Sequence, residues 1–153
     1  MFAIINDAIY QGTATATLVI SDGIANWRTN YFQTSENSGQ AADGFDADGD
    51  GLINSLEYAF GSDPTVQSSS QLLTITKNGS GFLLNFNAKQ ASGTGYIGLI
   101  RTYTVETTND LTSQSSWSPL AGYANIVGAS QVITINLSSV TTKCFFRLKV
   151  HVE

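Results

Sequence analysis

A short acidic stretch, DADGDGLINSLE at positions 46–57, holds residues whose types and spacing could bind a cation. Counted from Asp46, aspartates stand at positions 1, 3 and 5, a glycine at position 6 and Glu57 at position 12. Alternate residues of a tight loop can turn their carboxylates inward, and Gly51 permits the sharp backbone turn that this requires. The stretch fits the whole pattern of the calcium loop D-x-D-x-D-G-x5-E.

The same spacing assigns a part to the other residues of the loop. Leu52, at position 7, needs to offer only its backbone carbonyl, and Glu57 can close the shell with both carboxylate oxygens. Because the donors are oxygens and no histidine or cysteine is near, zinc and copper are excluded as first choices. Magnesium would need a smaller octahedral cage, so we predict bound calcium, Ca2+. The alternative is a solvated acidic turn at a helix start, where carboxylates are favoured in any case.

Short helices are predicted on both sides of this loop. Trp27 and Tyr31 stand one helical turn apart and predict a helix over 26–33. After the loop, Ile53, Leu56 and Phe60 recur on one face and predict a helix of about two turns. Gly61 suits the position after the helix, and Pro64 prevents its continuation. Residues 62–70 are then predicted to be a linker.

The rest of the chain has the two-residue period of β-strands. TATATLVI, at 13–20, alternates strictly, and a hairpin of 2–5 with 8–11 could precede it. Asn78–Gly79 predicts a hairpin turn between strands 72–77 and 81–88. Further strands are predicted at 100–108, near Trp117, and at 122–127, 131–137 and 143–152.

These elements predict a mainly β protein: an antiparallel β-sandwich of the immunoglobulin or fibronectin type, with a short helical EF-hand-like calcium segment. The predicted units are a β-strand segment over 1–22, the helical calcium segment over 23–64 and the sandwich over 65–153. The strand segment resembles the end of a preceding immunoglobulin-like or Calx-β repeat. Its edge must pair with the rest of this chain, with another molecule or with sequence outside this stretch.

Composition narrows the classes of function. The chain of 153 residues is 42% hydrophobic, only 12% charged, and carries a net charge of −5. Without a basic stripe, nucleic acid is not an expected partner. No apolar run reaches the length of a membrane span, and the first residues do not form a secretion signal. If the protein is secreted, we expect the signal to lie outside this sequence, which would then be a fragment of a longer chain or a processed product.

The loop resembles the calcium repeats of dockerins and thrombospondin type 3 domains. More broadly, WRTNYF followed by NSGQAADGFDADGDGLINSLEYAFGSDP resembles a C-terminal region of large secreted proteins of planctomycetes and verrucomicrobia. In those proteins a β-domain follows, with segments similar to YTVETTNDLTSQSSW at 103–117 and FFRLKV at 145–150. The resemblance covers about residues 26–151 and implies calcium ligation by the residues Asp46, Asp48, Asp50, Asn54 and Glu57 and by the carbonyl of Leu52.

The resemblance also implies an extracellular or cell-surface location and a structural task. Because there is one loop rather than a pair, a structural ion is a better interpretation than a calcium sensor. Asp43 and Asp63 flank the loop and could bind a second ion or a bridging water. We expect a calcium-stabilised, adhesive or architectural module that ends, spaces or anchors a longer surface protein.

No catalytic constellation is expected, so the chain is predicted not to be an enzyme. The single histidine, His151, and the single cysteine, Cys144, are seven residues apart, on opposite faces of a continuous strand. Glu106 and Asp110 are close in sequence, but Glu106 is expected on an outward strand face as ordinary surface charge.

Three alternative functions stay open. A carbohydrate-binding module could use Trp27, Tyr31 and Phe32, or Trp117 with Tyr123, as a platform for sugars, although tryptophans more often anchor cores. A fibre or surface-layer subunit could self-associate by donating a strand within 2–21 to a neighbour. The chain could also be an accessory domain of a secreted hydrolase.

Overall fold

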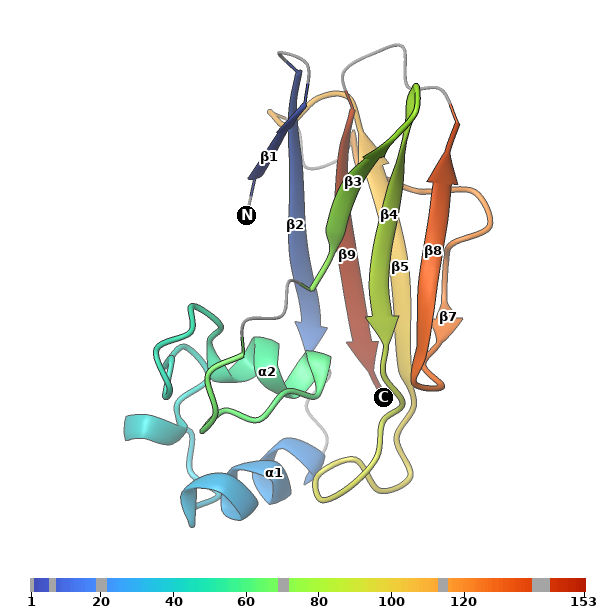
Figure 1. Ribbon diagram of the computed structural model, residues 1–153. Coiled ribbons are helices and arrows are strands. Elements are labelled where there is room, and N and C mark those ends of the chain that lie inside the picture. The colour runs from blue at the N-terminus through green and yellow to red at the C-terminus, as the bar shows by residue number, and fades with distance from the viewer. Residues whose placement is uncertain (1, 6–7, 19–21, 69–71, 113–115, 139–143) are drawn as a thin grey trace.

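The protein is mainly β, with two sheets and short helices gathered at one end (Figure 1). The computed structural model describes residues 2–5, 8–18, 22–68, 72–112, 116–138 and 144–153, and only the backbone of those before Gly23. The larger sheet has the order β1–β2–β9–β5–β6, with β7 also paired to β5. The smaller sheet has the order β3–β4–β8.

The strands lie close to the predicted ranges, except that the strand predicted over 122–127 is only two residues long. In the larger sheet they are β1 (Phe2–Ile5), β2 (Ala8–Leu18), β5 (Arg101–Thr108), β6 (Ser118–Pro119), β7 (Ile126–Val127) and β9 (Phe145–Val152). In the smaller sheet they are β3 (Thr74–Asn78), β4 (Gly81–Ala88) and β8 (Gln131–Leu137). The hairpin predicted at Asn78–Gly79 is confirmed, because Asn78 pairs with Gly81 and Gly79 has a φ of 59°.

One strand pair departs from the predicted antiparallel arrangement. β2 runs parallel to β9, from Gly12 opposite Phe146 to Leu18 opposite Val152, whereas the other pairs are antiparallel. Neighbouring strands joined by a tight turn must be antiparallel, but β2 reaches β9 from a distant part of the chain, so no turn fixes its direction. The first strand segment therefore pairs within this chain and belongs to the larger sheet.

The predicted first hairpin and the predicted strand after it form two strands, β1 and β2, rather than three. The predicted hairpin is confirmed, with Phe2 opposite Gln11 and Ile5 opposite Ala8. The strand predicted over 13–20 is the second half of β2, which continues from Ala8 to Leu18 without a break. Residues 6–7 and 19–20 lie outside the described residues.

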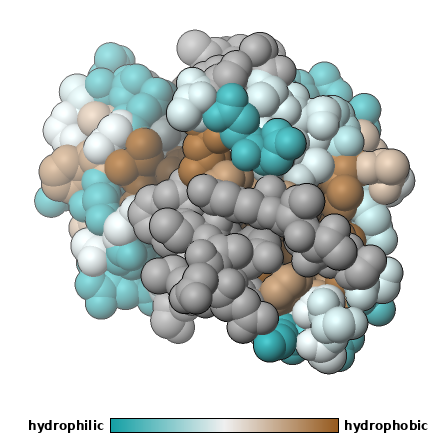
Figure 2. Space-filling view, turned by 90° about the horizontal axis from the view of Figure 1, so that it is seen from above, coloured by the Kyte–Doolittle hydropathy of each residue, from teal (hydrophilic) through white to brown (hydrophobic). Residues whose placement is uncertain are grey.

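The two sheets share one hydrophobic core. Successive side chains of a strand point to opposite faces, so Phe82, Leu84 and Phe86 of β4 are all buried on the inner face. Seen from the end away from the helices, hydrophobic residues show between more polar ones (Figure 2). Two sheets packed on one shared core are consistent with a β-sandwich. The described core consists of Phe60, Leu84, Phe86, Ala88, Tyr103, Val105, Ile135, Phe146, Leu148 and Val150.

The helices pack on one end of this sandwich around a second core (Figure 1). They are α1 (Asp22–Phe32), the short 3₁₀ helix η1 (Gly39–Ala41) and α2 (Asn54–Phe60). α1 begins four residues before the predicted start. α2 ends, as expected, just before Gly61, whose φ is 71°. No helix in the described parts of the chain is long and apolar enough to cross a membrane.

Aromatic side chains join the helical segment to the sandwich end. Trp27 of α1 is 1% exposed and meets the ring of Tyr58 of α2 at 5.7 Å between centroids. Tyr58 stacks on Tyr96 at 4.8 Å, donates its hydroxyl to the Gly95 carbonyl, and accepts the Tyr96 hydroxyl at its own carbonyl. The loop after β4 thus fixes α1 and α2 relative to the sheets.

We predict that replacing Gly95 by alanine weakens this junction more than the same change at Gly93. Both glycines have positive φ, 91° and 87°, so alanine costs about 1–2 kcal/mol of backbone strain at either position. At Gly95 an added Cβ would also lie 2.6 Å from the Cβ of Trp27, whereas nothing lies within 4 Å at Gly93. Overpacking of this kind adds about 1–3 kcal/mol.

The measurement is the free energy of unfolding in urea for both variants beside the parent protein. A clearly larger loss for Gly95→Ala is expected. Equal losses would show that Gly95 does not approach Trp27 as closely as the structure has it.

Candidate metal centre

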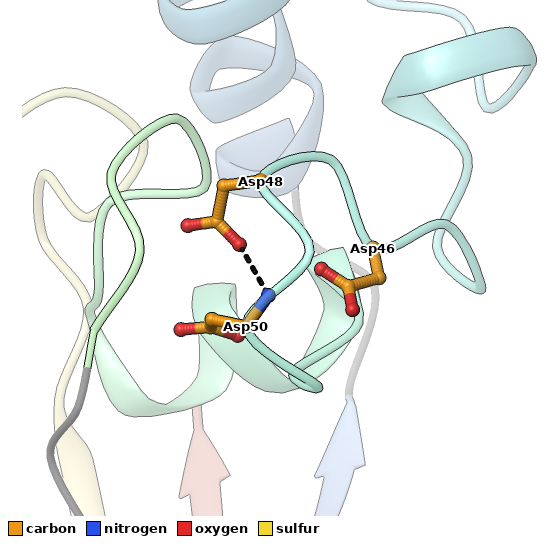
Figure 3. Close-up of side chains that lie close together, drawn as sticks. All are labelled: Asp46, Asp48 and Asp50. Carbon is orange, nitrogen blue, oxygen red and sulfur yellow. Dashed lines mark hydrogen bonds between the residues drawn. The ribbon is translucent and has the colours of Figure 1, made fainter.

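The three aspartates of the predicted loop lie close together (Figure 3). One carboxylate oxygen from each of Asp46, Asp48 and Asp50 lies within 4.8 Å of the others. Two oxygens bound to one calcium ion at 2.3–2.6 Å cannot be more than about 5.2 Å apart. The three oxygens are therefore close enough together to bind one metal ion.

Backbone amides of the loop hold Asp46 and Asp48 in this arrangement. The amides of Gly49 and Gly51 donate to the two Asp46 oxygens at 2.8 and 2.9 Å. The amide of Asp50 donates to Asp48 Oδ1 at 3.1 Å (Figure 3). Gly51 has a φ of 94°, a conformation that side chains disfavour, which explains the glycine at position 6.

Two residues beyond Pro64 complete the support of the loop and were not predicted. Ser68 donates from its amide and its hydroxyl to Asp50 Oδ2 at 2.9 and 2.8 Å, and Gln67 Nε2 donates to the Asp48 carbonyl at 2.6 Å. The stretch predicted to be a linker is therefore folded against the loop. No motif marks these two residues, because their role depends on the chain turning back after α2.

These hydrogen bonds favour the charged form of Asp50. Burial opposes its ionisation, but the bonds from the amides of Leu52 and Ser68 and from the Ser68 hydroxyl outweigh burial and lower its pKa. An ionised Asp50 is the form that a cation requires.

The burial of the Glu57 carboxylate without hydrogen-bond partners is the observation that points most directly to a bound cation. The Glu57 side chain is fully buried, and neither carboxylate oxygen has a hydrogen-bond partner among the described residues. One oxygen of Asp48, Oδ2, is also buried without a partner. A buried carboxylate without partners is costly, so oxygens in this state next to an acidic loop fit metal ligands.

The electrostatics of Glu57 agree with this interpretation. Burial raises its pKa to about 7, and the negative charges of Asp48, Asp50 and Asp46 add to the rise. The Ser62 hydroxyl is near enough to oppose the rise, but it makes no hydrogen bond to the carboxylate. Among the described residues, no Lys or Arg forms an ion pair with these four acids. The site has a deficit of positive charge that one divalent ion would reduce.

For the remaining predicted ligands, Asn54 and the Leu52 carbonyl, the structure gives less evidence of metal binding. Asn54 Nδ2 donates to the carbonyls of Gln40 and Ala42, both at 2.8 Å, and so fastens η1 to the start of α2. The other amide atom, Asn54 Oδ1, is buried without a partner among the described residues. Ligation by Asn54 and by the Leu52 carbonyl stays a prediction.

Both acids that flank the loop are engaged elsewhere. Asp43 forms an ion pair with Arg28 of α1 and accepts the side-chain amide of Asn37 at 2.9 Å. Asp63 accepts the amide and hydroxyl of Thr65 at 2.9 and 2.6 Å. Asp43 therefore links α1 to the loop, and a second ion at either residue stays a prediction.

Two other residues considered for function, Trp27 and Glu106, are buried and have structural roles. Trp27 is buried and cannot serve as a surface for sugars, which confirms its interpretation as a core anchor. The expectation of Glu106 as outward surface charge is wrong, because it is 8% exposed and paired with Arg147. The Arg147 guanidinium also covers the Trp117 ring at 4.5 Å. This cation–π contact helps to hold the guanidinium beside the buried Glu106 carboxylate.

Comparisons of the chain with protein-family models, with curated proteins and with solved structures found no match. The interpretation of the site depends on its own geometry.

Glu57→Gln is predicted to change protein stability in opposite directions with and without calcium. In chelator the substitution removes a buried charge beside three aspartates, so the midpoint of thermal unfolding should rise. In calcium it removes a charged ligand, so the midpoint should fall, by about 2–4 °C for each kcal/mol lost. Differential scanning calorimetry in both buffers measures the two shifts.

Glu36→Gln is the matched control, because Glu36 is exposed and outside the loop. It should leave both midpoints unchanged. Shifts of the same sign and size for Glu57→Gln in both buffers would contradict a metal-binding role.

Proposed function

We propose that this protein is a non-enzymatic, calcium-stabilised structural module of an extracellular or cell-surface protein. The observation that carries the proposal is the pair of buried, unpartnered oxygens of Glu57 beside the gathered oxygens of Asp46, Asp48 and Asp50. Three aspartates and a glutamate with two oxygens, completed by the Leu52 carbonyl, would supply more ligands than the few protein oxygens that magnesium takes. Calcium is therefore the proposed ion.

The proposed ion would cross-link three parts of the chain. The loop provides the aspartates, α2 provides Glu57, and Gln67 and Ser68 bring the following segment against the loop. Since Tyr58, next to Glu57, is packed in the second core, neutralising the acids would hold the helical segment firmly on the sandwich. A structural ion of this kind suits an extracellular protein, where modules work with dissociation constants of about 10⁻⁴ to 10⁻³ M.

We propose further that the protein has no catalytic function and no nucleic-acid partner. Within the described residues, one group of three or more close acids, histidines or cysteines occurs, and it is the calcium loop itself. The net charge of −5 supports a surface that does not attract nucleic acid. The resemblance to secreted bacterial proteins supports the proposed location and the immunoglobulin-like character of the sandwich.

Isothermal titration calorimetry of chelator-treated protein tests calcium binding. We expect at least one ion per chain, with a dissociation constant of about 10⁻³ M or tighter. Asp48→Asn should weaken binding by roughly tenfold or more, because it removes one charged ligand of the same shape.

Asp110→Asn is the control for that variant, because Asp110 accepts two bonds from Thr112 in a similar turn outside the site. Its calcium affinity should equal that of the parent protein. No heat of binding up to millimolar calcium would overturn the proposal.

A second candidate function, self-association by strand exchange, is favoured by the place of β2. This strand precedes the helical segment in sequence, yet it forms hydrogen bonds along β9, the last strand of the chain. A neighbouring copy could supply the same strand to the same edge, because β-strand addition depends on main-chain bonds. The resulting partner would be a second copy of this chain, in a dimer or a fibre.

Deletion of residues 1–21 tests whether this strand can be donated between molecules. We predict that the truncated protein binds a peptide spanning residues 8–18 and that its unfolding midpoint rises on binding. The full chain should not bind the peptide, because its own β2 already occupies the edge of β9.

A peptide of the same composition in scrambled order is the control. Size-exclusion chromatography with light scattering then compares the two chains, and strand-exchanged oligomers should be lost on deletion. A midpoint unaffected by the peptide, or oligomers that survive the deletion, would contradict strand donation.

A further inference from the structure

A polar cavity of about 350 Å³ lies beyond the end of α2, between α1, the loop after β4 and the start of β5. Its charged lining consists of Lys89 and Arg101, and no carboxylate is among the described residues that line it. Uncharged polar side chains of Asn30, Asn87, Ser92 and Ser130 make up much of the rest. The lining of the cavity therefore carries two positive charges on a chain whose net charge is −5.

Arg101 differs from the other two arginines in having no carboxylate partner. Arg28 pairs with Asp43 and Arg147 with Glu106, whereas no acid pairs with Arg101 among the described residues. Yet Arg101 is 2% exposed. A buried guanidinium without a counter-ion is costly, so its environment must replace the missing charge in another way.

Backbone carbonyls and a ring replace that charge only in part. Arg101 donates to the carbonyls of Gln90 at 2.9 Å and Tyr58 at 3.4 Å, and its guanidinium lies 4.7 Å from the centre of the Tyr96 ring. The Nε atom of Arg101 is buried and has no hydrogen-bond partner among the described residues. The side chain is thus held rigidly beside the cavity by two of its five N–H donors.

Lys89 brings a second cation to the same cavity. Its ammonium donates to the Gly61 carbonyl at 3.0 Å, after the last turn of α2. An ammonium has three donors, and the other two have no partner among the described residues. Both cations are therefore held in place by main-chain carbonyls. Lys89 keeps donors for a ligand, and Arg101, which is 2% exposed, adds its positive charge beside them.

We propose that this cavity binds a single sugar that carries a carboxylate, of the uronic-acid class. A guanidinium and an ammonium suit a carboxylate, while the amide and hydroxyl side chains around them suit sugar hydroxyls. The cavity is at the lower end of the size range of small-molecule sites, about 300–1,000 Å³, which favours one sugar ring over a longer chain. This inference goes beyond the calcium proposal and uses none of the predicted calcium ligands.

Two-dimensional ¹H–¹⁵N NMR of the full chain, titrated with D-galacturonate to about 20 mM, tests the proposal at the weak affinities that one sugar ring can give. The expected result is saturable shifts at the amides of Ser62, Lys89, Gln90, Tyr96 and Arg101. The neutral sugar D-galactose should bind at least roughly tenfold more weakly, because it lacks the charge-assisted contacts. No saturable shifts with galacturonate, or equal binding of galactose, would overturn the proposal.

Lys89→Gln is the decisive variant, because an amide can still donate to Gly61 while the charge is lost. It should weaken galacturonate binding by roughly tenfold and leave galactose unaffected. Lys77→Gln, a change at an exposed lysine on β3, is the matched control and should bind like the parent protein. Unchanged affinity of Lys89→Gln for galacturonate would also overturn the proposal.

Arg101→Lys provides a second test that keeps the charge but removes the Nε donor and the planar fork. Its affinity should fall while its fold, judged from the same spectra, is retained, and an affinity equal to that of the parent would count against the proposal. Titrations with and without calcium separate the two sites. Loss of calcium binding with galacturonate binding intact would reject the proposed function and leave this inference standing.

Discussion

The fully buried carboxylate of Glu57 constrains the arrangement of the whole helical segment. Glu57 lies in a helix of seven residues, with three aspartates before it and the aromatic core of Tyr58 beside it. Moving this carboxylate into water would displace Tyr58, and with it the contacts to Trp27 and Tyr96. The packing of α2 therefore keeps this carboxylate buried beside three other acids, where a bound cation would offset the negative charge.

Much of the fold follows from local patterns in the sequence. β4 and β8 have the predicted bounds, because each strand presents alternate hydrophobic residues to one side and polar residues to the other. The short helix α2 and its end at Gly61 likewise follow from an apolar face and a glycine in the left-handed conformation. The gathering of Asp46, Asp48 and Asp50 was predictable for the same reason, since all three belong to one short loop.

Features that depend on distant parts of the chain could not be predicted in this way. Nothing in the alternation of residues 13–20 indicates that β2 pairs with β9, or that it does so in parallel. Gln67 and Ser68 look like ordinary polar linker residues until the chain turns back to the loop. The burial of Glu106 depends on Arg147, a residue 41 positions away that reaches it only once β5 and β9 are paired.

The central claim is that one calcium ion is shared by the loop and by Glu57. Its most direct test is the crystal structure of the protein grown in calcium, with anomalous difference density recorded at a long X-ray wavelength. The account predicts one strong peak at 2.3–2.6 Å from oxygens of Asp46, Asp48, Asp50 and Glu57. A loop without such a peak at millimolar calcium, or a peak that the Glu57 carboxylate does not reach, would contradict it.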